Sequence, residues 1–362
     1  MKSIISNFNI DGSLVSADPF GSGHINDTFL VKVESGKGRE LRYVLQRINH
    51  VIFKNPIAIM DNIDRVTTHI KRKLIESNEK DIERKVLTVI KTRDGKNCVV
   101  DPDGNYWRLS LHIDGCKTYD AVETPEQAYE TGNAFGNFQK LLIDFPEPRL
   151  SETIPDFHNT PKRFKQFLNV LEEDKVNRAK SAEDEIKFVL ENESIVYVLI
   201  ELFEKGEIPE RITHNDTKLN NVLIDNKTGE CLCVLDLDTV MPGLALYDFG
   251  DMVRSATTFA FEDEKDISKV KLEMELFQSL AKGYMDSVGE YLNDVEKKYL
   301  PFSGKLITFE QTIRFLTDYL SGDPYYKVDY EDHNLIRTRT QKKLVQSITE
   351  HEDEMNKFVE SL

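Results

Sequence analysis

The sequence predicts a bilobal α+β fold, in which a small antiparallel sheet carrying one helix precedes a larger, mainly helical lobe. Short runs of alternating or apolar residues, separated by glycine-containing turns, fill much of the first 113 residues and are typical of an antiparallel sheet. Between residues 55 and 76 the apolar residues recur instead at three- and four-residue steps, which predicts a helix. Most of the remainder of the 362 residues is predicted to be helical, and a chain of this length commonly forms two domains.

Six strands are predicted in the first lobe. They are placed, in order, at residues 14–17, 28–33, 41–48, 86–91, 97–100 and 106–113. The helix at residues 55–76 lies between the third and the fourth of them. The sheet is expected to end near Gly115, with a hinge at residues 112–118, so that the chain divides into lobes of residues 1–114 and 115–362.

Composition and charge exclude several classes of protein. The formal net charge is −16, so nucleic acid or an anionic membrane would be repelled as a main partner. No apolar segment is long enough for a membrane span, and the first ten residues are too polar for a signal peptide. Four cysteines are too few for a disulfide framework in a chain of this size. We expect a cytoplasmic protein, either a monomer or a homodimer.

The most informative stretch is the polar loop at residues 214–221, with the sequence HNDTKLNN. In it Asp216 precedes Asn221 by five residues, and a later apolar strand ends at Asp236. One carboxylate can accept the proton of an attacking hydroxyl, while an amide oxygen and a second carboxylate hold the Mg²⁺ that gathers the nucleotide phosphates. The loop and the strand together predict a kinase that uses ATP and Mg²⁺, and a polar surface loop without function is the alternative.

A second carboxylate competes for the role of metal ligand. Asp248, followed by Phe249 and Gly250, looks like the magnesium motif of protein kinases. It lies 32 residues after Asp216 and follows a turn, whereas Asp236 lies 20 residues after it and ends a strand. We therefore assign the metal to Asp236 and interpret Asp248 as a structural acceptor that braces the loop.

A loop between the first two strands is a candidate for nucleotide binding. Gly21 and Gly23 lie in it, and such a loop can offer backbone N–H groups to phosphates. Asn26 and Thr28 follow as polar contacts. An ordinary hairpin turn would have the same pair of glycines.

The third strand departs from the protein-kinase pattern, which places a lysine there for the α- and β-phosphates. Gln46 stands at the corresponding position. Either Arg42 or Arg47 supplies the charge, or the nucleotide is held mainly by magnesium and backbone, or the strand faces the other way. The sequence leaves these alternatives open.

These motifs resemble the signature of the aminoglycoside phosphotransferase and choline kinase superfamily. Further stretches narrow the resemblance to the N-acetylhexosamine 1-kinases within it, at residues 23–26, 213–221, 236–239, 241–243, 248–251, 301–304 and 333–341. The resemblance runs nearly end to end. It implies a protein-kinase-like fold with a nucleotide-binding lobe at residues 1–114 and a catalytic, sugar-binding lobe at residues 115–362. The implied reaction is the ATP- and Mg²⁺-dependent phosphorylation of the anomeric hydroxyl of N-acetylglucosamine and N-acetylgalactosamine.

Matching positions imply individual roles. Asp216 corresponds to the catalytic base, Asn221 and Asp236 to the ligands of metal and phosphate, and Arg314 and Tyr325 to sugar contacts. The residues themselves add limited support, because a planar guanidinium suits hydroxyl and acetamido groups. A solvent-side ion pair of Arg314 with Asp318, four residues on in the same predicted helix, is the alternative.

Two other functions remain open. The first is a kinase for another small alcohol, such as choline or an aminoglycoside, because an aromatic and acidic cage could bind a cation; its candidates are Tyr325, Tyr326, Tyr330, Asp323, Asp329, Glu331 and Asp332. The second is an inactive nucleotide- or sugar-binding module, suggested by Gln46. The preference between the two sugar epimers, the use of unacetylated sugars and the extent of lobe closure are not determined by the sequence.

Overall fold

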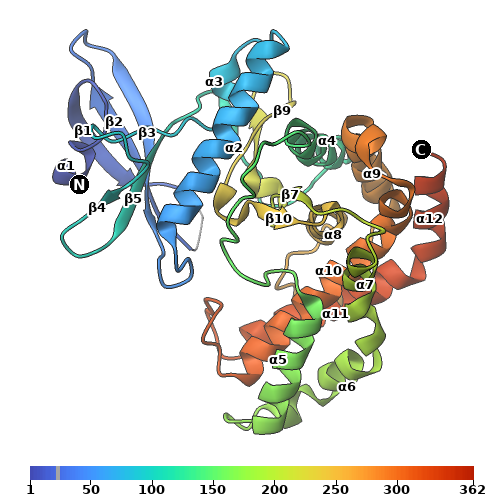
Figure 1. Ribbon diagram of the computed structural model, residues 1–362. Helices are drawn as coiled ribbons and strands as arrows, with labels where there is room; N and C mark the ends of the chain where they lie inside the picture. The colour runs from blue at the N-terminus through green and yellow to red at the C-terminus, as the bar shows by residue number, and fades with distance from the viewer. Residues whose placement is uncertain (22–24) are drawn as a thin grey trace. The chain divides into compact units, whose positions relative to one another are not determined.

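The chain forms two compact units in the computed structural model, which describes residues 1–21 and 25–362 (Figure 1). Unit 1 comprises residues 1–117, 144–155 and 223–241, and unit 2 comprises residues 118–143, 156–222 and 242–362. The predicted α+β fold is confirmed, because unit 1 holds a five-stranded antiparallel sheet and unit 2 is mostly helical. The division of function between residues 1–114 and 115–362 stays a prediction.

The sheet of unit 1 has the strand order β1-β2-β3-β5-β4, and all neighbouring strands are antiparallel. The strands are β1 (Ser13–Pro19), β2 (Asp27–Glu34), β3 (Glu40–Ile48), β4 (Val99–Val100) and β5 (Tyr106–Leu111). One face of this sheet forms a hydrophobic core with the N-terminal segment, which includes the short helix α1 (Lys2–Ile5). Phe8 from that segment is fully buried against Val31, Leu45 and Leu109. The opposite face is therefore the one available for polar residues.

The strand predicted at residues 86–91 is wrong. The short helix α3 (Ile82–Lys85) ends just before this segment, which meets β5 at a single bridge between Val89 and Ser110. The Ile90 N–H donates to the Leu109 carbonyl oxygen (2.8 Å), and the Leu111 N–H donates to that of Thr88 (2.9 Å). The pairing stays this short because β4 pairs with Tyr106 and Trp107 on the same edge of β5.

The helix α2 (Pro56–Glu76) confirms the pattern predicted at residues 55–76. The Asn55 side chain caps it by accepting a hydrogen bond from the Ala58 N–H at 3.1 Å. Its buried Asn62 donates to the carbonyl oxygens of Ser151 (2.7 Å) and Val240 (3.0 Å). Asn62 thus ties α2 to the two later segments of the chain that belong to unit 1.

A second, three-stranded sheet has the order β6-β8-β9. Its strands are β6 (Cys116–Lys117), β8 (Val222–Asp225) and β9 (Cys231–Val234). The strand-turn-strand pattern around residue 226 predicts β8 and β9. Asp225 forms an ion pair with Arg84, with 2.7 Å between Asp225 Oδ2 and Arg84 Nη2. All four cysteines are free thiols, as expected from their number.

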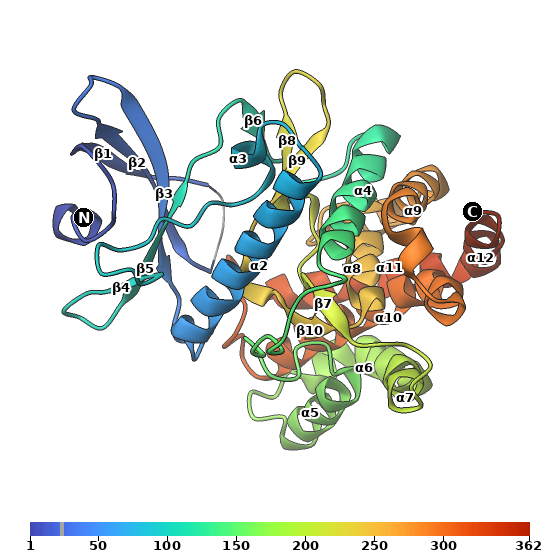
Figure 2. The ribbon, with the colours of Figure 1, turned by 45° about the horizontal axis from the view of Figure 1, so that its top comes forward.

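Unit 2 is built from long helices around a central one. They are α4 (Pro125–Leu141), α5 (Thr160–Glu173), α6 (Glu183–Glu191), α7 (Val198–Glu204), α8 (Ala245–Ala256), α9 (Met274–Val288), α10 (Asp294–Leu320), α11 (His333–Glu350) and α12 (Glu352–Glu360). The helix α10 is buried over most of its length and packs against α5, α8, α11 and α12 (Figure 2). A two-stranded sheet of β7 (Arg211–Thr213) and β10 (Met241–Gly243) completes this part.

The helices α4 and α9 approach so closely that only glycine fits at the contact. A Cβ atom at Gly283 would lie 2.1 Å from the carbonyl oxygen of Tyr129, and one at Gly132 would lie 2.2 Å from that of Leu280. Backbone atoms cannot yield to a methyl group without moving the helix. The two glycines therefore set the spacing of this helix pair.

We expect Gly283→Ala to lower the free energy of unfolding by about 1–3 kcal/mol, because overpacking forces the two helices apart. Urea denaturation of the full chain measures this. Gly36→Ala is the matched control, since a Cβ atom there meets nothing within 4 Å, and it should change the value by less than about 0.5 kcal/mol. Equal stability of the Gly283→Ala variant and the parent would contradict the role of this contact.

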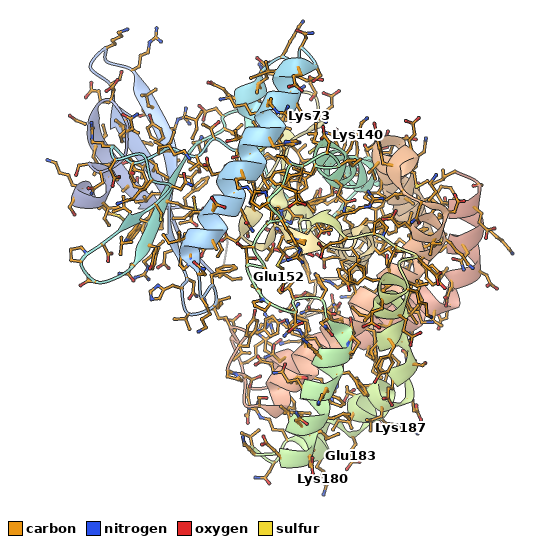
Figure 3. The ribbon with its side chains drawn as sticks, in the orientation of Figure 1. Lys73, Lys140, Glu152, Lys180, Glu183 and Lys187 are labelled. Carbon is orange, nitrogen blue, oxygen red and sulfur yellow. The ribbon has the colours of Figure 1, made fainter. Side chains whose placement is uncertain are left out.

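The outer surface of unit 2 is charged where α6 follows the short helix η1 (Ala179–Ala182). Lys180, Glu183 and Lys187 are exposed there (Figure 3). They line a shallow groove together with Ile186 and Leu190. Among the helices of the described residues, none combines the length and the apolar character that crossing a membrane requires.

Candidate active site

The polar loop after β7 brings two of the predicted residues together. Asn221, which ends the short helix η3 (Leu219–Asn221), donates from its amide nitrogen to the Asp216 carbonyl oxygen (2.8 Å) and to Asp216 Oδ2 (3.0 Å). The Asp216 side chain remains 27% exposed. Because the amide nitrogen of Asn221 is turned to Asp216, its amide oxygen is turned to the other side of the group.

Lys218 holds the Asp216 carboxylate in its ionised form. Its ammonium nitrogen lies 2.9 Å from Asp216 Oδ1. Burial raises the pKa of Asp216, but the charge of Lys218 and the hydrogen bond from Asn221 outweigh burial and hold this pKa below its ordinary value. The sequence prediction missed Lys218, although a residue two positions further along a loop can return its side chain to the same place.

Lys218→Met should move the acidic limb of the pH profile of kcat/KM to higher pH. In the parent, the lowered pKa keeps Asp216 ionised into acidic solution, so activity that depends on this carboxylate is lost only below its ordinary range. Without the ammonium group, burial raises the pKa and the loss occurs at higher pH. The control is Lys227→Met, an exposed lysine of the β8-β9 turn, and an unchanged limb in Lys218→Met would refute the coupling.

Asp248 braces the loop, as its position predicts. This fully buried residue of α8 accepts hydrogen bonds from the backbone N–H groups of His214 (3.0 Å) and Asn215 (2.7 Å) and from the amide of Gln139 (2.7 Å). Burial raises the pKa of Asp248, and these hydrogen bonds act in the opposite direction. Asn215 has a left-handed backbone with φ of 64°, a conformation that costs energy in a non-glycine residue and needs such support.

Asp251, nearly one helical turn after Asp248, fixes the other side of the loop. Its carboxylate accepts from the Thr217 N–H at 2.8 Å and from Arg254 Nε at 2.8 Å. Thr217 also donates from its hydroxyl to the Asp248 carbonyl oxygen at 2.7 Å. The backbone on both sides of Asp216 is therefore anchored to α8, and this rigid support suits the catalytic role predicted for Asp216.

A cavity of about 270 Å³ in unit 2 contains both predicted sugar contacts. Its lining comes from α5, α10 and the segment after α10, and includes Arg314 and Tyr325. Tyr325 is 49% exposed. The other lining residues are Arg163, Gln166, Ile313, Thr317, Asp318, Ser321, Pro324 and Tyr326. The sequence prediction missed Arg163, because the distance along the chain from Arg314 hides their shared cavity.

Two guanidinium groups and one carboxylate, that of Asp318, line the cavity, and the charge of the Glu310 carboxylate acts on both arginines. Arg163 donates to the Phe157 carbonyl oxygen at 3.1 Å, and Arg314 donates to Gln311 Oε1 at 3.0 Å and lies 5.1 Å from the centre of the Phe157 ring. Neither guanidinium forms an ion pair with any residue that the structure describes. Burial and the charge of Arg314 lower the pKa of Arg163. The two guanidinium groups repel each other, and a ligand whose oxygens accept hydrogen bonds from both reduces this repulsion.

The ion pair of Arg314 with Asp318 does not form. The Asp318 carboxylate instead accepts from the backbone N–H groups of Tyr325 and Tyr326, each at 2.9 Å, and from the Asn334 amide at 2.9 Å. Asp318 thereby shapes the wall of the cavity, and the alternative reading of Arg314 as half of a surface ion pair is wrong.

The predicted phosphate loop is only partly described. Gly23 lies outside the described residues. Gly21 has a left-handed φ of 81°, and a Cβ atom there would meet nothing within 4 Å. The backbone conformation favours glycine, and the role of this loop in nucleotide binding stays a prediction.

Asn26 and Thr28 belong to a polar network within unit 1. The Asn26 amide donates to Asp238 Oδ2 at 2.7 Å, and its oxygen accepts from the Asn49 N–H at 2.9 Å. The Thr28 hydroxyl accepts from Gln46 Nε2 at 3.1 Å. Their side chains are thus fixed in place by protein partners, and their contact with phosphate stays a prediction.

Arg108 is the cation that stands beside Gln46. Its Nε donates to Gln46 Oε1 at 2.9 Å, and its two terminal nitrogens donate to the Asp238 carboxylate, one of them at 3.1 Å. Arg108 and Asp238 are 8% and 2% exposed. The sequence prediction missed both, although an arginine within an apolar strand was a signal of a buried partner.

Asp236 follows β9 in unit 1. It is exposed and has a left-handed φ of 54°, just before the short helix η4 (Leu237–Thr239). Its carboxylate oxygens and the amide oxygen of Asn221 are the hard donors that Mg²⁺ prefers, and few protein ligands suit a metal whose other ligands are phosphate and water. Among the described residues no group of three or more His, Cys, Asp or Glu residues forms a ready metal cage. Asp236 belongs to unit 1 and Asn221 to unit 2, and a metal held by the two stays a prediction.

Comparison with protein families identifies the chemistry. The model of the phosphotransferase enzyme family matches residues 16–267, more than half of the chain. The chain belongs to this family. The phosphotransferase has an α+β fold of the protein-kinase-like kind found in solved structures of related kinases.

The phosphotransferase is similar over nearly its whole length to several solved structures. A microcompartment-associated aminopropanol kinase shares 16% identity, with 97% of this chain and 96% of that chain covered and a TM-score of 0.62. An aminoglycoside phosphotransferase from Alicyclobacillus acidocaldarius shares 11%, with coverage of 100% and 97% and a TM-score of 0.61. The amicoumacin kinase hAmiN, in complex with AMP-PNP, Ca²⁺ and Ami, shares 13%, with coverage of 90% and 87% and a TM-score of 0.55. At these identities the likeness is one of fold.

Proposed function

We propose that this phosphotransferase is a sugar 1-kinase that uses ATP and Mg²⁺ to phosphorylate the anomeric hydroxyl of N-acetylglucosamine and N-acetylgalactosamine. The observation that carries the proposal is the cavity in unit 2, where Arg314 and Tyr325, the two sugar contacts that the sequence predicts, lie together. Its volume of about 270 Å³ lies just below the roughly 300–1,000 Å³ usual for small-molecule sites. We take the enzyme to be cytoplasmic and to act as a monomer or homodimer.

The chemistry of the cavity suits an acylated sugar. Guanidinium groups donate in a fixed plane to oxygen acceptors, and the carbonyl oxygen of an acetamido group is a strong acceptor. Arg163 and Arg314 supply such donors, and the Asp318 carboxylate in the same lining accepts from backbone N–H groups. The half-exposed ring of Tyr325 offers a flat apolar surface. A neutral, oxygen-rich acceptor relieves the repulsion between the two charges.

The proposed roles follow the sequence prediction. Asp216 accepts the proton of the anomeric hydroxyl while the hydroxyl oxygen bonds to the γ-phosphorus, and the bond from phosphorus to the bridging oxygen breaks to release ADP. We assign the metal to Asn221 and Asp236; when bound, Mg²⁺ neutralises charge on the phosphates. The nucleotide contacts are assigned, within a lobe of residues 1–114, to Gly21, Gly23, Asn26 and Thr28.

Cationic acceptors such as choline or an aminoglycoside fit the cavity less well. Two of the four acids proposed for a cationic cage have other partners, since Asp323 pairs with Arg178 at 2.5 Å and Asp332 accepts from the Tyr319 hydroxyl at 3.3 Å. Of the acids around this segment only Asp318 lines the cavity, and backbone N–H groups occupy it. A cationic ligand would face Arg163 and Arg314 instead. The close pairing of Asp216 with Asn221 also weighs against an inactive binding module.

Phosphorus NMR of the product tests the proposal, because it reports both the acceptor and the position of transfer. The panel contains N-acetylglucosamine, N-acetylgalactosamine, glucosamine, choline and one aminoglycoside. We expect anomeric phosphates from the two acetylated sugars and, because an ammonium group is repelled by two guanidinium groups, at least about tenfold lower kcat/KM for glucosamine. Arg163→Gln should reduce this difference in kcat/KM between the acetylated sugars and glucosamine. Turnover of choline or the aminoglycoside above that of the acetylated sugars would overturn the assignment, and absence of turnover throughout would favour a binding module.

A further inference from the structure

The sheet of unit 1 has no lysine at the place on its third strand where protein kinases hold the nucleotide phosphates. Gln46 occupies this position, yet a polyphosphate needs positive charge beside it. We propose that Arg108 on β5 supplies this charge to the nucleotide phosphates, with Asp238 as the acid that holds its guanidinium in position. The inference rests on the use of ATP in the proposed function and is independent of the identity of the acceptor.

Strand register places Arg108 on the appropriate face of the sheet. Gln46 lies opposite Thr28 on β2 and opposite Arg108 on β5, and residues directly opposite one another share a face. Their neighbours Leu45 and Leu109 point into the hydrophobic core on the other side. Arg108 therefore lies on the same face as the side chain it replaces, one strand further on.

The hydrogen bonds leave Arg108 able to bind an anion. An arginine has five N–H donors, and with the residues that the structure describes Arg108 makes three bonds, one to Gln46 and two to Asp238. One donor on each terminal nitrogen remains for phosphate oxygens. Asn26 donates to the same Asp238 carboxylate at 2.7 Å, so the guanidinium and its acid are held from two sides.

Arg108 keeps its positive charge although it is buried. Burial lowers the pKa of Arg108, whereas Asp238 and then Asp236 raise it more, so the guanidinium stays charged. A buried ion pair contributes little net stability compared with an apolar pair of the same size. Its value here is a positive charge kept in a fixed position close to Asp236, the carboxylate assigned to the metal.

The two arginines of β3 are committed elsewhere. Arg47 lies opposite Trp107, on the core side of the sheet, and pairs with Asp27. Arg42 is 41% exposed and pairs with Asp114 at 3.1 Å. Of the three candidate arginines, Arg108 is therefore the one whose guanidinium is held beside Gln46.

Binding of AMP-PNP, measured by calorimetry with Mg²⁺ and without any acceptor, tests the inference. Arg108→Gln combined with Asp238→Asn replaces the pair by neutral groups that can still hydrogen-bond, so the fold is retained. We expect this double variant to bind AMP-PNP roughly tenfold to a hundredfold more weakly, the range for a hydrogen bond to a charged group. Arg47→Gln is the matched control and should bind as the parent does.

A rescue variant tests whether the loss of AMP-PNP affinity comes from the missing positive charge or from a disturbed fold. Gln46→Lys combined with Arg108→Gln returns a cation to the face of the sheet, now on β3, and keeps Asp238 as its partner. We expect this rescue variant to bind AMP-PNP at least about tenfold more tightly than the neutral pair. Thermal unfolding shows whether each variant is folded. Binding of the neutral pair within twofold of the parent would overturn the proposal, as would a folded rescue variant that binds no better than the neutral pair. Since no sugar is present, the result is separate from the choice of acceptor.

Discussion

Asp216→Asn is expected to lower kcat by a factor of roughly 10² to 10⁴, the range for a positioned proton acceptor. An amide of the same shape can keep the contact with Asn221, but it cannot accept the proton of the attacking hydroxyl. Lys218, 2.9 Å away, keeps the parent carboxylate ionised and ready to accept. Steady-state assays measure the loss, and calorimetry with AMP-PNP should show nearly unchanged nucleotide binding.

The control for this variant is Asp353→Asn, which neutralises an exposed carboxylate on α12. It should keep the parent kcat. Near-normal turnover in Asp216→Asn would remove this residue from the mechanism. A parallel loss of AMP-PNP affinity would point instead to a role of Asp216 in holding the metal.

Much of the fold could be predicted because its signals are local. Alternation along residues 28–33 and 41–48 is confirmed in β2 and β3, and the helical spacing of residues 55–76 is confirmed in α2. The strand predicted at residues 86–91 was wrong for a non-local reason. Its apolar pattern is that of a strand, but β4 shares the edge of β5 that it would need.

The site divides in the same way. Asp216 and Asn221 could be predicted to meet because five residues of one loop separate them, and a hydrogen bond of 3.0 Å joins them. The cavity that Arg163 shares with Arg314 could not be predicted, and the apolar strand around Arg108 signalled a buried partner without identifying Asp238, since in both cases the second residue is far away in the chain. The predicted ion pair of Arg314 with Asp318 is absent because the backbone N–H groups of residues 325 and 326 bind the Asp318 carboxylate instead.

Asp248→Ala is expected to have the largest effect on stability. It leaves three donors, the N–H groups of His214 and Asn215 and the amide of Gln139, without their acceptor in a fully buried place. An unsatisfied buried donor costs about 1–3 kcal/mol, so we expect a loss of roughly 3–5 kcal/mol out of the 5–15 kcal/mol typical of a domain. Urea denaturation of the full chain measures it.

We also expect Asp248→Ala to abolish kinase activity at urea concentrations at which the variant is still folded. Asn215, with φ of 64°, is held in its left-handed conformation by the carboxylate of Asp248, and without that bond the backbone is free to relax and carry Asp216 away from the acceptor. Asp353→Ala, which removes an exposed acid from α12, should change stability by less than about 0.5 kcal/mol. If Asp248→Ala unfolded within about 1 kcal/mol of the parent and kept its kcat, α8 would not be what positions the loop, and rigidity would have to come from Asp251 through its bond to the Thr217 N–H.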